Sequence, residues 1–351
     1  MNVDQKRLEE FMHRAVVDLG AAASAALVLL GDRLGLYKAL AEGPATPAEL
    51  SRRTGCAERY LREWLGNQAA GGYVTLDAAR GEYSLTPEQA MALAQEDSPV
   101  FLPGAFQLLQ AMWRAEPRME ENFRNGDGIP WTEQDRSLFE GTERFFKPGY
   151  AAHIVDEWIP ALSGMEEKLR RGAKVADVGC GHGASTVIMA KAYPNSSFTG
   201  FDYHPASIET ARRRAEAAGV DDRTCFVVAP ATEFSGDGYD LVAHFDCLHD
   251  LPDPLGAARR AREALAKDGS WMIVEPFAGD SVAENLNPVG RVFYAASTMF
   301  CVPNALAFHG AALGAQAGEK RIGEVVREAG FGNFRRATQT PFNLVFEARA
   351  G

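Results

Sequence analysis

Apolar residues change their spacing along this chain, from a helical period near the N-terminus to alternating strand and helix patterns after residue 173. Leu8, Phe11, Met12 and Val16 recur at helical intervals, which predicts an early helix. From Ala173 onward, short apolar runs alternate with longer helical segments. Such alternation is typical of βαβ units and predicts a doubly wound sheet of the α/β class.

The second part of the chain supplies five strand candidates, with helix candidates between them. The predicted strands are Val175–Val178, Ser197–Phe201, Cys225–Ala229, Leu241–Phe245 and Trp271–Val274. The predicted helices lie around Ser185–Ala192, Pro205–Ala218 and Pro254–Ala266.

The first part has the order of elements of a winged helix. A capping box begins a short helix, a glycine ends it, and a second helix and two strand candidates follow: Thr46–Glu49, Gly55, Glu58–Leu65, Gly72–Leu76 and Glu82–Leu85. In a DNA reader the second helix would enter the major groove. Here that helix mixes arginines with glutamates, and its apolar side holds Tyr60, Leu61, Trp64 and Leu65. Dimerisation and covering of an active site are therefore the favoured uses.

A glycine-rich loop follows the first predicted strand of the sheet. The strand ends at Asp177, three glycines stand at alternate positions (Gly179, Gly181 and Gly183), and a helical segment begins at Ala184. Glycines there allow a sharp turn and a close approach of a ligand to the backbone. The next strand ends in Asp202, and a carboxylate at this place suits a ribose diol. The pattern predicts a nucleoside-cofactor site at the mouth of a parallel sheet.

The identity of the cofactor depends on the charge of this loop. Gly179, Gly181 and Ala184 also satisfy the dinucleotide pattern G-x-G-x-x-G/A. Asp177, however, would repel a nearby pyrophosphate, and the loop contains an extra glycine, Gly183, and no Lys or Arg. These features favour a cofactor with a cationic amino-acid tail, S-adenosylmethionine (SAM).

Several motifs together resemble the class I SAM-dependent methyltransferases, in particular a bacterial subgroup with an N-terminal winged-helix domain. They are 177–183, Gly200–Asp202, Phe245–Asp250, Glu143–Phe146, Glu284–Arg291 and Gly314–Glu319. The resemblance implies a mostly parallel seven-stranded sheet closed by an antiparallel hairpin from Phe331–Arg336 and Asn343–Ala348. It implies a helical and winged-helix dimerisation domain at 1–98, a helical connector at 99–150 and a SAM-binding domain at 151–351, with a substrate-covering insertion near 278–318.

The same resemblance assigns the cofactor-binding residues. They are Asp177, Gly179, Cys180, Gly181, Gly183, Asp202, Tyr203, Ala231, Thr232 and Phe245. The chain departs from the wider family after the third strand, where an aspartate commonly holds the adenine amino group and Ala229-Pro230-Ala231-Thr232 stands instead. Adenine recognition is then expected from the backbone of Ala231 and the hydroxyl of Thr232.

His249 is the candidate general base among the seven histidines. It follows the strand Leu241–Phe245 at the edge where open α/β sheets bind ligands, and a pKa near neutrality suits proton removal. His249-Asp250 resembles the His-Asp of plant small-molecule O-methyltransferases, whose base is oriented by an acid at the place of Glu275. The histidine could also cap a helix or contact the cofactor. N- or C-methylation by alignment alone, SAM used for non-methylating chemistry, and a SAM-sensing winged-helix regulator remain open.

Composition limits the partners and the compartment. The chain has 351 residues, 46% of them hydrophobic, and a net charge of −11, which works against nucleic acid and anionic membranes. Its start lacks a signal pattern, and its five cysteines are scattered, as in a cytoplasmic protein with reduced thiols and no metal site. A small-molecule acceptor is the expected partner. Apolar and aromatic residues between Glu275 and Gly318 suggest that it is flat and partly hydrophobic.

Overall fold

The computed structural model describes residues 3–351 and divides into two compact units; Met1 and Asn2, which the predicted first domain includes, lie outside the described residues. The first unit contains the chain up to Trp113 together with Arg136–Gly149, and the second contains Arg114–Asp135 and Tyr150–Gly351. The two long helices α6 (Pro103–Asn125) and α7 (Arg136–His153) contribute to both units. The segment predicted as a connector is therefore shared between them.

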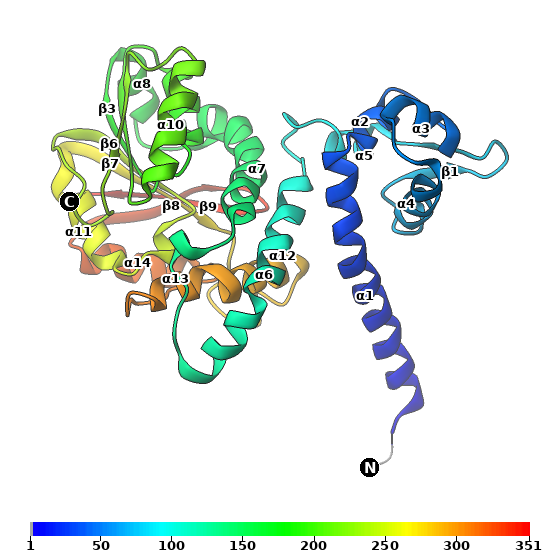
Figure 1. Cartoon of the computed structure of the whole chain (residues 1–351). Coiled ribbons are helices and arrows are strands. Elements are labelled where there is room, and N and C mark those ends of the chain that lie inside the picture. Colours follow the sequence, from blue (N-terminus) through cyan, green and yellow to red (C-terminus); the bar gives the residue numbers. More distant parts are fainter. Residues whose placement is uncertain (1–2) are drawn as a thin grey trace. The chain divides into compact units, whose positions relative to one another are not determined.

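The first unit has the predicted order of helix, turn, helix and hairpin (Figure 1). Its elements are α1 (Gln5–Arg33), α2 (Leu36–Ala41), α3 (Pro47–Thr54), α4 (Glu58–Ala70), β1 (Thr75–Asp77), β2 (Glu82–Ser84) and α5 (Pro87–Leu93). The predicted capping box is present, because the Thr46 hydroxyl accepts from the Glu49 N–H and the Glu49 side chain accepts from the Thr46 N–H. Gly55 ends α3 with a φ of 72°.

The core of this unit forms where α4 packs against α2 and α3. Leu61, Trp64 and Leu65 are buried, as their predicted place on the apolar side of the second helix requires. Tyr60 is an exception, because it is 79% exposed. It lies one position outside the stripe of Leu61, Trp64 and Leu65, which alone has the spacing of a core-facing helix side.

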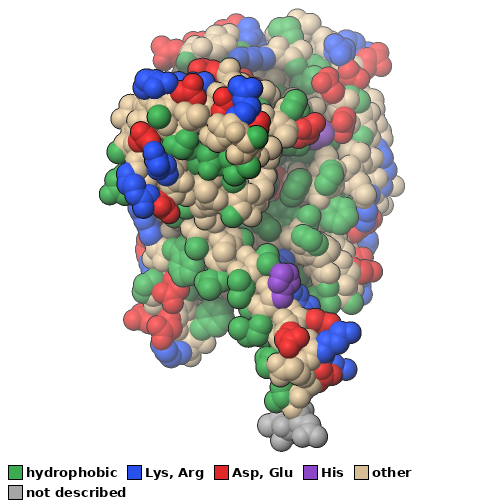
Figure 2. All heavy atoms as spheres, turned by 90° about the vertical axis from the view of Figure 1, so that its right-hand side faces the viewer, with side chains coloured by type: hydrophobic (Ala, Val, Ile, Leu, Met, Phe, Trp, Pro, Cys, Tyr) green, Lys and Arg blue, Asp and Glu red, His purple; other side chains and the backbone are tan. Residues whose placement is uncertain are grey.

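Helix α1 is exposed along most of its length and buried only near its C-terminal end. Its N-terminal part presents Leu8, Phe11, Met12, Val16 and Leu19 to solvent, and Figure 2 shows apolar side chains beside charged ones next to the grey terminal residues. Among residues 3–351 it is also the one helix with the length and apolar character to span a membrane, with 22% of its most apolar window buried. A helix that packs on another protein surface passes the same test.

The second unit is built on the predicted seven-stranded sheet. Its strand order is β5-β4-β3-β6-β7-β9-β8, with β3 (Lys174–Val178), β4 (Ser197–Asp202), β5 (Thr224–Val228), β6 (Tyr239–Phe245), β7 (Leu265–Pro276), β8 (Asn333–Gln339) and β9 (Asn343–Arg349). The first five strands are parallel, and β9 and β8 form the predicted antiparallel hairpin. The chain order therefore reverses between β3 and β6.

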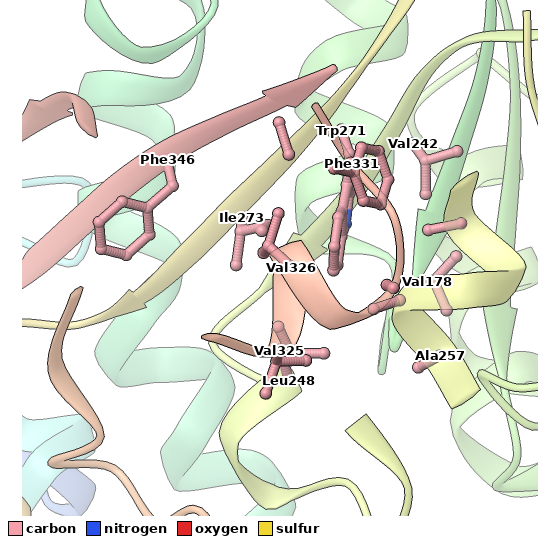
Figure 3. Close-up of a cluster of buried hydrophobic side chains, with 14 of the residues drawn as sticks. Val178, Val242, Leu248, Ala257, Trp271, Ile273, Val325, Val326, Phe331 and Phe346 are labelled. Atoms are coloured by element: carbon pink, nitrogen blue, oxygen red, sulfur yellow. The ribbon is translucent and has the colours of Figure 1, made fainter. Parts of the chain in front are cut away.

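Helices cover both faces of this sheet (Figure 1). They are α8 (Met165–Arg171), α9 (Ala184–Ala192), α10 (Pro205–Ala217), α11 (Pro254–Ala264) and α14 (Gly318–Glu328), with α12 (Pro288–Ala296) and α13 (Val302–Leu306) in the predicted insertion. Short turns of 3-10 or π helix are η1 (Trp131–Glu133), η2 (Ile154–Trp158), η3 (Leu248–Asp250) and η4 (Ser297–Cys301). Figure 3 shows one face, where Trp271 and Ile273 of β7 pack against Val326 of α14.

Strand β7 is much longer than the predicted Trp271–Val274. It begins at Leu265, where the sequence pattern predicts the end of a helix, and runs to Pro276. The first half of the strand was not recognised because the polar stretch Lys267-Asp268-Gly269 interrupts its apolar pattern. Lys267 and Asp268 are exposed, whereas every residue from Gly269 to Pro276 is buried. Burial on both faces is expected for a strand in the middle of a covered sheet.

Candidate active site

The carboxyl ends of β3 and β6 meet at the reversal of strand order, where open α/β sheets bind ligands. The glycine loop begins here, and Gly179 has a φ of 76°. A Cβ on Gly179 would lie 2.6 Å from the Cys247 Sγ, so the loop after β6 requires a glycine at this position. The N–H groups of Gly179 and Cys180 both donate to the Phe201 carbonyl, at 2.8 and 3.0 Å. The loop is thus anchored to the end of β4.

Asp177 is fully buried directly before this loop. Its Oδ2 accepts hydrogen bonds from the hydroxyls of Ser185 and Thr186 at the start of α9, each at 2.6 Å. Its Oδ1 has no hydrogen-bond partner in the described structure. Burial, partly offset by these two hydroxyls, raises the pKa of Asp177 to about 6. A buried carboxylate oxygen without a partner suits an N–H donor or a cationic group brought by a ligand.

Asp202 lies at the end of β4 with its carboxylate fixed in place. Its Oδ2 accepts from the Gly181 N–H at 2.9 Å, and its Oδ1 accepts from the His204 N–H at 2.8 Å. Asp202 is half-buried, and burial raises its pKa. A carboxylate oxygen can accept two hydrogen bonds, so each oxygen can still accept one from a ligand hydroxyl. This geometry fits the predicted contact with a ribose diol.

The other predicted cofactor residues differ in exposure. Tyr203 is 36% exposed beside Asp202, and Ala231 and Thr232 are half-buried in the turn after β5. Cys180 is buried, and Phe245 is packed against the rings of Tyr150 and Trp158. The side chain of Phe245 therefore belongs to the core.

His249 and Glu275 form the predicted pair. His249 lies in η3, after β6, and Glu275 is near the end of β7. The His249 Nδ1 is 2.7 Å from the Glu275 Oε2, and both side chains are about 5% exposed. Because a carboxylate can only accept, Nδ1 carries the proton of this hydrogen bond. The Glu275 Oε1 accepts from the Leu248 N–H at 3.0 Å, so both carboxylate oxygens are fixed by hydrogen bonds.

The charge of His249 depends on its neighbours. Burial lowers the pKa of His249, but the Glu275 carboxylate and a hydrogen bond with the Cys301 thiol outweigh burial and hold it well above the usual value. Cys301 is buried in η4, within the predicted insertion. Its contact with His249 was not anticipated, because the two residues are far apart in the sequence and a single cysteine in an apolar run gives no signal.

Asp246 is a second site residue that sequence reasoning missed. It follows β6 directly, and both of its carboxylate oxygens accept hydrogen bonds, from the Tyr150 hydroxyl at 2.7 Å and from the Asn343 amide at 2.8 and 3.1 Å. Its N–H donates to the Val274 carbonyl at 2.8 Å. An acid at the carboxyl end of a central strand was a usable signal, although its partners were not predictable.

The polar residues of the insertion have structural roles. Asn285 is buried and exchanges hydrogen bonds with both backbone groups of Gly279, and Asn287 caps α12 through the Gly290 N–H. His309, in the same insertion, is exposed with a φ of 55°. Among residues 3–351, no group of three or more His, Cys, Asp or Glu side chains is arranged to hold a metal ion.

Two protein families match separate parts of the chain. The methyltransferase domain family matches residues 169–330, and the Rv2258c-like winged helix-turn-helix domain matches residues 22–95. The chain is 30% identical over 192 residues to the 27-O-demethylrifamycin SV methyltransferase of Amycolatopsis mediterranei, which covers 52% of this chain. It is 37% identical over 133 residues to the ubiquinone biosynthesis O-methyltransferase of Bordetella avium, which covers 37% of this chain. The chain spans 62% and 52% of the lengths of these two relatives.

Solved structures share the fold along nearly the whole chain. The mitomycin 7-O-methyltransferase MmcR is 21% identical with a TM-score of 0.69, covering 98% of this chain and 100% of its own. Human N-acetylserotonin methyltransferase in complex with SAM is 16% identical with a TM-score of 0.70, covering 100% of both chains. The chain therefore contains a methyltransferase domain preceded by a winged helix-turn-helix domain of the Rv2258c-like type, and it shares the fold of these solved methyltransferases.

Proposed function

We propose that the protein transfers a methyl group from SAM to a hydroxyl of a small molecule, with His249 as the general base. The observation that carries this proposal is the buried His249–Glu275 pair at the same sheet edge as the glycine loop. The Bordetella avium relative is named as an O-methyltransferase, and the Amycolatopsis mediterranei relative is named as the methyltransferase of 27-O-demethylrifamycin SV. A base close to the cofactor loop is what O-methylation requires, since a hydroxyl must lose its proton as the new bond forms.

The site residues fit SAM. Four carboxyl groups lie at this sheet edge, where burial raises the pKa of Asp177, Asp202, Asp246 and Asp250, and the Asp177 Oδ1 has no partner in the described structure. The glycine loop allows the backbone to approach the ligand, and Asp202 would hold the ribose hydroxyls. A ligand bearing ammonium and sulfonium groups complements such a site, whereas a pyrophosphate would be repelled.

SAM, when bound, supplies an electrophilic methyl group on a good leaving group, so the protein has to align the acceptor and exclude water. Glu275 accepts the Nδ1 proton of neutral His249 and thereby places the accepting lone pair of the imidazole on Nε2. The acceptor hydroxyl then passes its proton to Nε2. Because the pKa of His249 is raised, the neutral, competent imidazole becomes more populated as the pH increases.

Three alternatives from the sequence predict different behaviour. N- or C-methylation by alignment alone would not need His249 as a base. Non-methylating use of SAM would give no methylated product, and the methyltransferase relatives do not favour it. A SAM-sensing regulator would need a basic recognition helix, but Arg59 and Arg62 of α4 are paired with Glu63 and Glu58.

We also propose that the protein is a cytoplasmic homodimer joined through the first unit. The apolar side chains of α1 are exposed over several turns, and burying one such side chain contributes about 1.5–3 kcal/mol. Exposed apolar side chains that run along a helix of 29 residues mark an interaction surface, and the proposed partner on this surface is a second copy of the chain. All five cysteines are unpaired, as expected in a reducing compartment.

The oligomeric state is tested by light scattering on the wild type and on Val16→Asp. We expect a dimer for the wild type and a monomer, with the second unit still folded, for the variant. Glu10→Gln in the same exposed part of α1 is the matched control and should remain dimeric. A monomeric wild type would contradict the dimer.

The proposed reaction is tested by incubating the protein with SAM and a panel of phenols and aromatic amines, with methylated products identified by mass spectrometry. We expect methylated phenols from the wild type and a loss of turnover of about 10²–10⁴-fold in His249→Ala. Binding of S-adenosylhomocysteine (SAH) should be kept. Unchanged turnover in His249→Ala would remove the base and favour methylation by alignment alone.

A further inference from the structure

Asp246 is held in a backbone conformation that its residue type rarely adopts. Its φ is 48°, and it is one of three non-glycine residues with positive φ among residues 3–351. Such a conformation costs about 1–3 kcal/mol and persists only where surrounding contacts impose it. Glycine would fit here without strain. Because glycine lacks the carboxylate, we infer that the carboxylate has a role at this position.

The partners of this carboxylate fix its direction without neutralising its charge. The Tyr150 hydroxyl and the Asn343 amide are both neutral donors, and burial together with the Asp246 carboxylate keeps the pKa of Tyr150 well above its usual value. Tyr150 and Asn343 are buried, whereas Asp246 keeps part of its surface accessible. The carboxylate is thus held in one direction, and it carries its charge mainly at pH values above its pKa of about 7.

The charged side chains around Asp246 do not neutralise the negative charge of its carboxylate either. Glu275 repels it, and the imidazole of His249, which attracts it, is already paired with Glu275 at 2.7 Å. Tyr150 and Asn343 are its hydrogen-bonding neighbours from α7 and β9. Burial raises the pKa of Asp246 to about 7, and the hydrogen bonds from Tyr150 and Asn343 oppose this rise only in part.

The position of Asp246 indicates which cation this is. On one side, its neighbour Cys247 contacts the glycine loop through the Val178 carbonyl, at 3.3 Å from the Sγ. On the other side, Asp246 is followed by His249 and hydrogen-bonds to Val274, next to Glu275. The reactive centre of the cofactor has to lie between the loop that binds it and the base that deprotonates the acceptor. Asp246 follows β6, which lies in the sheet between β3, where the glycine loop begins, and β7, which contains Glu275.

We propose that Asp246 makes the cofactor site charge-selective, its carboxylate attracting the sulfonium of SAM and favouring SAM over the neutral product SAH. This inference rests on the proposed function, because it assumes that SAM is the cofactor. The same chemistry, a cationic or hydrogen-donating centre, could come from the acceptor instead. The two sources are distinguished by ligands that lack any acceptor.

The experiment measures the dissociation constants of SAM, SAH and sinefungin by calorimetry at pH 8, without acceptor. Sinefungin carries an amine in place of the sulfonium methyl. The proteins are the wild type, Asp246→Asn, Asp246→Gly and the surface control Asp222→Asn. We expect the preference for SAM and sinefungin over SAH to fall about ten-fold in both Asp246 variants, which corresponds to about 1.4 kcal/mol. SAH affinity should change less than two-fold, and the control should resemble the wild type.

Asp246→Gly keeps the test decisive if Asp246→Asn is poorly folded, because glycine relieves the strained φ. Equal weakening of SAM and SAH in both variants would overturn the proposal and give Asp246 a structural role. An unchanged preference combined with a raised KM for a methylated phenol would overturn it in favour of acceptor binding. Absence of SAH binding to the folded wild type would instead refute the proposed function itself.

Discussion

Replacing Glu275 by glutamine tests how the sheet edge prepares His249. The carboxylate of Glu275 accepts two hydrogen bonds, from the His249 Nδ1–H at 2.7 Å and from the Leu248 N–H at 3.0 Å. Glutamine has nearly the same shape but offers one acceptor oxygen and one donor NH2. In Glu275→Gln, one of the two donors therefore meets another donor.

The magnitude follows from the burial of these groups. A buried donor without a partner costs about 1–3 kcal/mol. If the amide oxygen keeps Leu248, the NH2 group points at Nδ1 and shifts the imidazole proton to Nε2, where it blocks proton acceptance. We therefore expect kcat/KM to fall about 10²–10⁴-fold. The melting temperature should fall by roughly 2–4 °C per kcal/mol for a unit of this size.

The assay combines three readouts: methyl-transfer kinetics with a phenol found in the screen, SAH calorimetry, and the tautomer of His249 from 15N NMR. Glu347→Gln is the matched control, because Glu347 is a buried carboxylate of β9 that binds Ser163, Ser270 and Arg335. We expect the control to lose stability but to keep turnover per folded molecule. A Glu275→Gln protein with wild-type turnover and an Nδ1–H tautomer would refute the reasoning.

Three further predictions concern charge and backbone. The pKa of Asp177 is raised from 3.8 to about 6 in the folded protein, so about 3 kcal/mol of folding stability is present below pH 4 and is lost as the pH rises to 6. In Asp177→Asn this loss should be absent when thermal unfolding is measured at several pH values. Stability that changes with pH in the same way in the variant and the wild type would contradict the prediction. Gly179→Ala should destabilise the protein by about 1–3 kcal/mol and weaken SAH binding in calorimetry, because the new Cβ would clash with Cys247. The control Gly219→Ala also has a positive φ but faces open space, and it should keep its SAH affinity. Equal SAH affinities of the two variants would contradict a role of the glycine loop in cofactor binding. The rate of methyl transfer should rise with pH through the raised pKa of His249, and a rate that falls over this range would exclude neutral His249 as the base.

The sequence predicted the sheet well because its strands are marked by short apolar runs and by acids at their carboxyl ends. Asp202 ends its strand, and Asp177 and Glu275 each stand one residue before the end of theirs; parallel strands bring such ends together. The pairing of His249 with Glu275 could be anticipated for that reason. The first half of β7 escaped because a polar stretch interrupts its apolar pattern.

The contacts around these residues were beyond sequence reasoning, since they join segments that no local pattern relates. Tyr150 and Asn343 are 96 and 97 positions from Asp246, and the left-handed backbone of Asp246 is imposed by that packing. Cys301 reaches His249 from the insertion. In the insertion, Asn285 and Asn287 stabilise local turns through their side-chain amides. Residue type alone does not distinguish a capping amide from a ligand-binding one.

The central claim is that the edge formed by β3, β4 and β6 binds the nucleoside cofactor of methyl transfer. Calorimetric titration of the wild type and of Asp202→Ala with SAH tests it most directly, because Asp202 is fixed by the Gly181 and His204 N–H groups to hold a ribose diol. We predict micromolar binding to the wild type and a collapse of affinity in the variant. A folded wild type that does not bind SAH, or a variant that binds it equally well, would contradict the account.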